Sequence, residues 1–245
     1  MDHHSMNPYT SQLDEQIETV RKKLEELHLT SIIETGARFL LDPQIKHEPT
    51  LISPDEERRN VRITFIEACI KIAAKLDAPV VSIWSGAKNP NIDDDTAWKW
   101  LVDGCKVISR AAAENNLLIG FEPEPGMMIE TMAQYRLLKS EVDHDAFRLT
   151  LDLGHAFITE KDVCKVIQDF RHDIVNIHLE DMKKQIHDHL FFGEGDMDFV
   201  PIFETLSRIN YSGQVNIELS RHSHNAVQIS KEAINLIKQI TDSVL

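Results

Sequence analysis

The chain has 245 residues, 42% of them apolar, which is enough to bury a sizeable core and is typical of a single α/β domain. Its 40 acidic and 26 basic residues give a net charge of −14, which repels phosphate backbones and anionic lipids, so we expect neither nucleic acid nor a membrane as a partner. The 3 cysteines lack CxxC spacing, and no stretch has the length of a membrane span or the pattern of a secretory leader, which indicates a cytoplasmic protein with reduced thiols.

Helical and strand patterns alternate along the chain, which predicts βα units and a mainly parallel sheet. Residues 1–10 are interpreted as a tag remnant and an N-terminal arm, and residues 11–245 as a single barrel domain. The expected strands are 31–39, 79–85, 117–122, 147–153, 174–179 and 214–219. The expected helices are roughly 11–28, 55–76, 94–115, 130–140, 160–170, 200–209 and 225–242.

This pattern has six strands, whereas a closed TIM (β/α)8 barrel has two more. Because the first clear element is a helix, the missing pieces are most simply the opening strand, helix and strand. We therefore expect a TIM (β/α)8-type barrel that lacks its first strand-helix-strand. An irregular N-terminal segment or a partner chain would close it, which favours a homodimer.

Four successive predicted strands each carry one metal-binding side chain near the carboxyl end: Glu122, Asp152, His178 and Glu218. Alternate residues of a strand face the same way, and in a barrel these four side chains would meet. Each alone has an ordinary structural explanation, as an ion-pair partner or a core histidine. Together, with few basic residues in the same strand ends, they favour a divalent cation, since three buried carboxylates would otherwise repel one another.

Further polar or aromatic residues near the same strand ends are candidates for substrate binding, and each could instead cap a loop, pack in the core or face solvent. They are Glu124, His155, Asp181, His187, His189, Arg221, His222, Trp84 and His47. His187 and His189, two residues apart, could share one face of an extended segment and hold a second metal with His155, with substrate contact or surface exposure as alternatives. Arg221 and His222 suit an anionic group such as phosphate or carboxylate, and Trp84 suits the face of a sugar ring.

The motifs Phe-Glu-Pro-Glu-Pro, Leu-Asp-Leu-Gly-His, Ile-His-Leu-Glu-Asp, Phe-Gly-Glu-Gly-Asp-Met-Asp-Phe and Ile-Glu-Leu, taken in this order, resemble the xylose isomerase-like superfamily of TIM barrels. This superfamily includes sugar phosphate isomerases and epimerases. The resemblance implies one divalent cation (Mn, Mg, Co or Zn) on Glu122, Asp152, His178 and Glu218. It also implies that Glu122 and Glu218 move the substrate proton, and that His155 contacts the substrate.

The function expected from this resemblance is a metal-dependent isomerase or epimerase of a sugar or sugar phosphate, acting by proton transfer through an ene-diolate. The chain departs from the sugar epimerases where they carry a substrate arginine after the histidine strand, since it has Met182, Lys183 and Lys184 there. One alternative is an apurinic endonuclease-like hydrolase with a further metal on the three histidines, against which the net charge argues. The other is a non-catalytic, metabolite-binding barrel.

Overall fold

The computed structural model of the chain describes residues 1–3 and 5–244, so His4, which belongs to the expected tag remnant, lies outside the described residues. Six parallel strands form one sheet in the order β1-β2-β3-β4-β5-β8. The strands are β1 (Ile33–Glu34), β2 (Val80–Trp84), β3 (Leu118–Glu122), β4 (Phe147–Asp152), β5 (Ile174–Leu179) and β8 (Gln214–Ile217). A short antiparallel hairpin of β6 (Asp181–Lys183) and β7 (Ile186–Leu190) follows β5.

The helices follow the expected places, with two additions. They are α1 (Leu13–Leu27), α2 (Glu56–Lys75), α3 (Asp94–Glu114), α4 (Met132–Val142), α5 (Leu153–Thr159), α6 (Val163–Asp169), α7 (Phe199–Arg208) and α8 (Ala226–Val244), with the 3₁₀ helix η1 (Ser220–Asn225) before α8. Each of the six helices α2 to α7 begins after a residue whose side chain accepts a hydrogen bond from a backbone N–H of the first turn. These capping residues are Asp55, Asp93, Thr131, Asp152, Asp162 and Asp198.

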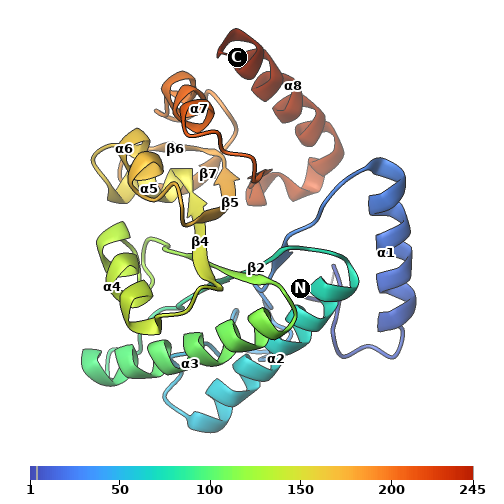
Figure 1. Cartoon of the computed structure of the whole chain (residues 1–245), viewed down its shortest axis with the longest axis vertical. Coiled ribbons are helices and arrows are strands. Elements are labelled where there is room, and N and C mark those ends of the chain that lie inside the picture. The colour runs from blue at the N-terminus through green and yellow to red at the C-terminus, as the bar shows by residue number, and fades with distance from the viewer. Residues whose placement is uncertain (4, 245) are drawn as a thin grey trace.

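The sheet curls into a half-barrel with helices on its outer side, which confirms the predicted barrel class (Figure 1). Strands β1 and β8 are its two edges, and each pairs on one side only among the described residues. Helix α1 packs against α2, and α8 packs against α7 and η1. Each strand-helix pair therefore delivers the carboxyl end of its strand to the same rim of the sheet.

Several expected boundaries differ from those observed, and three strand ends matter for the site. The first strand, expected at 31–39, ends at Glu34, because the chain then turns through Ala37 and Arg38, both with positive φ. The last strand ends at Ile217 rather than at residue 219. The fourth strand ends at Asp152, because the Asp152 side chain caps α5, a helix that the sequence pattern did not predict.

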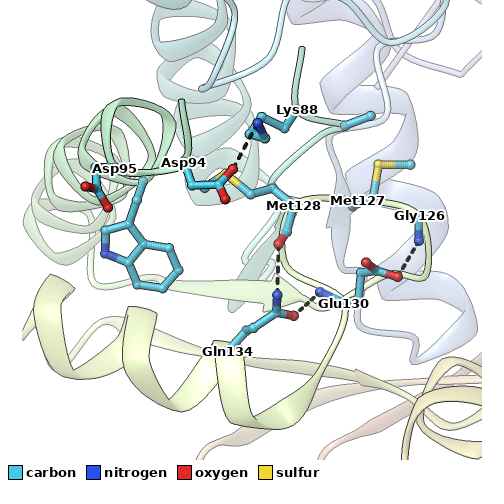
Figure 2. A pocket seen from close by; sticks show the side chains of 10 residues that line it. Lys88, Asp94, Asp95, Gly126, Met127, Met128, Glu130 and Gln134 are labelled. Atoms are coloured by element: carbon cyan, nitrogen blue, oxygen red, sulfur yellow. Dashed lines mark hydrogen bonds and ion pairs between the residues drawn. The ribbon is translucent and has the colours of Figure 1, made fainter. Parts of the chain in front are cut away.

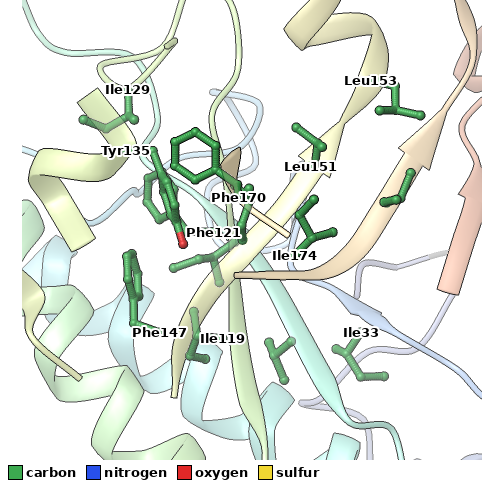
Figure 3. Packing of buried hydrophobic residues seen from close by; sticks show 14 of the residues in the cluster. Ile33, Ile119, Phe121, Ile129, Tyr135, Phe147, Leu151, Leu153, Phe170 and Ile174 are labelled. Carbon is green, nitrogen blue, oxygen red and sulfur yellow. The ribbon is translucent and has the colours of Figure 1, made fainter. Parts of the chain in front are cut away.

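The core lies between the sheet and the outer helices. Phe121 of β3 packs against Phe147 of β4 and Tyr135 of α4, with ring centroids 5.5 and 6.4 Å apart. Phe170, just after α6, lies 5.9 Å from Tyr135, and Figure 3 shows these rings grouped on the helix side of the strands. Because Phe121 occupies that side, the next residue of β3, Glu122, is directed to the inside of the half-barrel.

The inner face of the sheet is polar and hydrogen-bonded. Thr150 of β4 donates to Ser82 of β2 at 3.3 Å, and Asn216 of β8 donates to Asn176 of β5 at 2.8 Å. The first of these hydrogen bonds spans the intervening strand β3, and the second joins two neighbouring strands. No helix among the described residues is long and apolar enough to cross a membrane.

Candidate metal centre

The four residues singled out at the strand ends meet in the structure. Glu122 ends β3, Asp152 ends β4, His178 lies near the end of β5 and Glu218 directly follows β8. Each offers one ligand atom, and these four atoms all lie within 4.8 Å of one another. The parallel register explains the meeting, because Asp152 is aligned with His178 and the Glu218 N–H donates to the Leu179 carbonyl of β5.

His178 is the centre of this group. Its Nδ1 lies 3.1 Å from Glu122 Oε1 and 3.1 Å from Glu218 Oε2, so this nitrogen faces the carboxylates. Its Nε2 lies 3.1 Å from Glu34 Oε1 and 3.1 Å from Asn176 Nδ2. The ring is therefore oriented from behind by Glu34 and Asn176, which leaves Nδ1 as the ligand atom.

Glu34, Asn176 and Glu180 belong to this site and were not among the expected residues. Asn176 and Glu180 stand two residues before and two after His178, so strand alternation directs them to the same face and could have predicted both. The position of Glu34 at the rim could not be predicted in this way. The first strand was expected to extend to residue 39, whereas in the structure it ends at Glu34.

A cation fits the donor set of this site. Asp152 Oδ1 accepts the backbone N–H of His155 at 2.7 Å, whereas the buried Asp152 Oδ2 has no hydrogen-bond partner. A buried carboxylate oxygen without a donor is costly, and a bound cation would remove that cost. Three carboxylates and one imidazole are a ligand set that Mn, Mg, Co or Zn accepts.

The pKa shifts show the strongly negative character of the site. Burial raises the pKa of Glu122 well above its usual range, against the opposing charge of His178. Burial alone would lower the pKa of His178, but the charges of Glu122 and Glu34 hold it well above its usual value. Burial alone would raise the pKa of Glu218, but its hydrogen bond to His178 keeps it lowered. Without a cation, the surroundings therefore favour a positive charge on His178 itself.

The pKa of Glu124 is also affected by the carboxylates of the metal centre. Glu124 is half-buried in the loop after β3, and burial together with the negative charges of Glu218 and Asp152 raises its pKa to about 7. Its backbone N–H donates to the Ile129 carbonyl at 3.0 Å, which closes the loop.

His155, His187 and His189 form a second cluster beside the first. Their ligand nitrogens lie within 4.8 Å of one another, and Nε2 of His155 is 2.9 Å from Nε2 of His187. His155 is buried on α5, and its Nδ1 lies 3.6 Å from both Glu122 and Asp152. Burial lowers the pKa of His155 to about 4, so its imidazole is neutral near pH 7. Hairpin β6–β7 presents the other two histidines, with His187 the more exposed.

Asp181, expected as a substrate contact or an orienting group, faces away from this centre. Its carboxylate accepts hydrogen bonds from the backbone N–H groups of Met182, Gly193, Gly195 and Met197, at 2.8 to 3.2 Å. It is buried and joins the start of the hairpin to the loop that follows it. Asp181 therefore holds the segment that carries the histidines.

The basic residues after β8 reach the outer rim. Arg221 is exposed, and its Nε lies 2.5 Å from Oδ1 of Asp188 on the hairpin. The ring of His222 lies 6.4 Å from that of Phe191 in an edge arrangement. Both contacts tie η1 to the hairpin and place these side chains at the edge of the site.

Trp84 and His47 lie together beside β1. Their rings are 5.6 Å apart in an edge arrangement, and the guanidinium of the buried Arg62 lies 4.6 Å from the Trp84 ring. The contact between His47 Nδ1 and the Gly36 carbonyl, at 2.6 Å, fixes the histidine ring. The indole is thus half-buried against α2 and the long loop before it.

A hollow of about 490 Å³ lies between the first turns of α3 and α4 (Figure 2). Lys88 pairs with Asp94 there at 2.9 Å, and Gln134 closes the opposite wall through Met128 and Glu130. None of the candidate metal ligands lines it. It is therefore separate from the metal centre.

A protein family described as "Xylose isomerase-like TIM barrel" matches residues 3–240. Among solved structures, 3-keto-D-glucoside 4-epimerase from E. coli is similar with a TM-score of 0.77 and 20% identity, over 92% of this chain and 85% of that chain. L-ribulose 3-epimerase is similar with a TM-score of 0.77 and 18% identity, over 93% and 80% of the two chains. At these identities the structural similarity establishes the fold.

Curated relatives by sequence include inosose dehydratase from Clostridium perfringens, which is 24% identical over 168 residues, or 61% of this chain and 57% of the relative. The corresponding enzyme from Clostridium tetani is 24% identical over 191 residues, covering 71% and 61%. The chain thus spans less than two thirds of the length of these relatives.

Proposed function

Since the chain belongs to the xylose isomerase-like TIM barrel family, we propose that it is a metal-dependent isomerase or epimerase of a sugar or a sugar phosphate. The observation that carries this proposal is the convergence of Glu122, Asp152, His178 and Glu218 within 4.8 Å at the strand ends. A divalent cation bound there would stabilise negative charge on the oxygens of a hydroxy-carbonyl substrate.

Glu122 and Glu218 are the proposed proton-transfer residues. They flank Nδ1 of His178 at 3.1 Å each, and come from strands on opposite sides of β5. One carboxylate removes the proton from the carbon next to the substrate carbonyl, which leaves an ene-diolate. Return of a proton to the opposite face gives an epimer, and return to the neighbouring carbon gives an isomer.

The surrounding residues are proposed to bind the substrate. His155 is neutral and lies 3.6 Å from Glu122, so it can donate to or accept from a sugar hydroxyl beside the reacting carbon. Arg221 at the outer rim suits an anionic group at the far end of the substrate. The other proposed substrate contacts are Glu124, His187, His189, His222, Trp84 and His47. Asp181 is proposed to act only through the loop that it holds.

Dehydration of a ketone-bearing polyol is a second candidate reaction, favoured by the similarity to inosose dehydratase. It begins with the same removal of a proton next to the carbonyl. Dehydration then departs from isomerisation and epimerisation. The C–O bond at the next carbon breaks, and the hydroxyl group takes up a proton and leaves as water. The same residues serve both reactions up to the ene-diolate.

The test is solvent deuterium exchange. The full chain loaded with Mn²⁺ is incubated in D₂O with a panel of ketoses and ketose phosphates and followed by NMR. An isomerase or epimerase exchanges the proton next to the carbonyl and forms a second sugar, whereas a dehydratase forms a product one water lighter. Glu218→Gln should reduce exchange at least about 100-fold, the usual range for loss of a general base.

Glu194→Gln is the matched control, because Glu194 is an exposed carboxylate on the loop after the hairpin, and it should exchange like the wild type. Metal binding without exchange for any sugar would contradict the proposal and favour a metabolite-binding barrel. Full exchange in Glu218→Gln would contradict the assignment of the proton-transfer residue.

A further inference from the structure

Glu180 is a buried carboxylate that lies beside another carboxylate, that of Asp152. It follows β5 directly and has no exposed surface, and neither of its oxygens has a hydrogen-bond partner. Among the described residues no lysine or arginine forms an ion pair with it. A carboxylate removed from water in this way either takes up a proton or needs a positive group beside it.

Gly154 makes room for this carboxylate. A Cβ atom at position 154 would lie 2.0 Å from Glu180 Oε1 and 2.8 Å from the terminal carbon of Met182. The close approach of α5 to the end of β5 is therefore possible only without a side chain at position 154. The chain thus has a local arrangement that directs Glu180 toward Asp152 rather than away from it.

Two neighbouring side chains each have a buried atom without a hydrogen-bond partner. Asp152 Oδ2 and His189 Nδ1 are buried and have no hydrogen-bond partner. One ligand atom each of Asp152, Glu180 and His189 lies within 4.8 Å of the others. The three side chains come from β4, the end of β5 and the hairpin, so the arrangement is tertiary and does not follow from one element.

We infer that Asp152, Glu180 and His189 bind a second divalent cation, with Asp152 shared between this site and the four-residue centre. The inference rests on the proposed function, which supplies the first cation. Two carboxylates and one imidazole suit Mn²⁺ or Zn²⁺. The shared carboxylate would use Asp152 Oδ2, the oxygen that no N–H reaches.

The three-histidine cluster is the competing position for a second cation, and the geometry favours Glu180 over it. Nε2 of His187 faces Nε2 of His155 at 2.9 Å, so each of these two nitrogens already has a partner. His187 is also exposed on the hairpin, whereas Glu180 is fully buried. His189 belongs to both groups, so only variants of Glu180 and His187 separate them.

The test is Mn²⁺ stoichiometry on the full chain, by equilibrium dialysis and elemental analysis, together with electron paramagnetic resonance. The wild type should bind two Mn²⁺ per chain with the spectrum of a coupled pair. Glu180→Gln should bind one Mn²⁺ with the spectrum of an isolated ion, while His187→Ala and the exposed control Glu194→Gln should keep two. Glu180→Ala, which also removes the ligand but leaves a smaller side chain, provides a second route to the same loss if Glu180→Gln fails to fold.

The outcomes separate the two proposals. No bound Mn²⁺ in the wild type would contradict the proposed function itself. One bound Mn²⁺ in the wild type, or two in Glu180→Gln, would contradict only the second cation and would mean that a proton neutralises Glu180. Loss of one Mn²⁺ in His187→Ala but not in Glu180→Gln would overturn the inference in favour of the three-histidine site.

Discussion

Two aspartates at the rim differ because of their backbone surroundings. Asp152 uses one oxygen to cap α5 and leaves the other free among the metal-binding groups. Asp181 follows β5 by two residues and accepts four backbone hydrogen bonds instead. Strand alternation explains this difference, since Asp181 lies three residues after His178 and so faces the opposite way, whereas Glu180 shares the face of His178.

Asp181→Ala should destabilise the protein by about 3 kcal/mol, because several buried N–H groups would lose a charged acceptor. The free energy of unfolding from urea titration measures the effect. Asp196→Ala is the control on the neighbouring loop, since the exposed Asp196 makes one such hydrogen bond, from the Lys184 N–H at 3.1 Å, and should cost less than about 1 kcal/mol. Equal losses in the two variants would show that Asp181 does not organise the loop.

Gly120 on the inner face of β3 leaves room for side chains of both neighbouring strands. A Cβ at position 120 would lie 2.3 Å from Thr150 Oγ1 and 3.0 Å from Val80 Cγ1. Thr150 in turn is hydrogen-bonded to Ser82, so its hydroxyl is held in place. The space at position 120 is therefore already filled by the side chains of the neighbouring strands.

Gly120→Ala should therefore cost roughly 1–3 kcal/mol of stability, the usual range for overpacking a core. Combining it with Thr150→Ala should recover part of that loss, because the nearest clashing atom is removed. A double-mutant cycle on the free energies of unfolding measures the coupling. If the losses of stability in the two single variants simply add in the double variant, the Thr150 side chain is not what limits the space at position 120.

The packing of the outer helices on the sheet determines which of the cysteine thiols solvent can reach. Cys69 on α2 and Cys105 on α3 are fully buried, whereas Cys164 on α6 is half-buried. Burial raises the pKa of Cys69 to about 12 and also raises that of Cys105, which keeps both thiols protonated. A thiol must be both accessible and ionised to react.

A thiol-specific reagent at pH 8 should therefore modify one cysteine rapidly in the native chain and all 3 after denaturation. Cys164→Ser should abolish the rapid phase and leave the denatured count at 2. Rapid reaction of Cys69 or Cys105 in the native protein would contradict the packing of α2 and α3 on the sheet.

The sequence by itself determined the order of the six sheet strands and of the main helices, the half-barrel class and the four candidate ligands, but not helix α5 or the hairpin β6–β7. Each of these depends on local periodicity: apolar residues alternate with Glu122, Asp152 and His178, and a parallel sheet brings strand ends to one rim. The boundaries at Glu34 and Asp152 were missed because chain turns and helix caps there interrupt an otherwise strand-like pattern.

Only the tertiary structure decided which polar groups face one another. Glu34 reaches His178 from a strand 144 residues away, and His189 reaches Asp152 from a hairpin. No spacing along the chain encodes such contacts, because they depend on the sheet curvature and on the approach of α5 that Gly154 permits. The difference between a structural Asp181 and an unpartnered Glu180 likewise depends on where the backbone N–H groups of the loop lie.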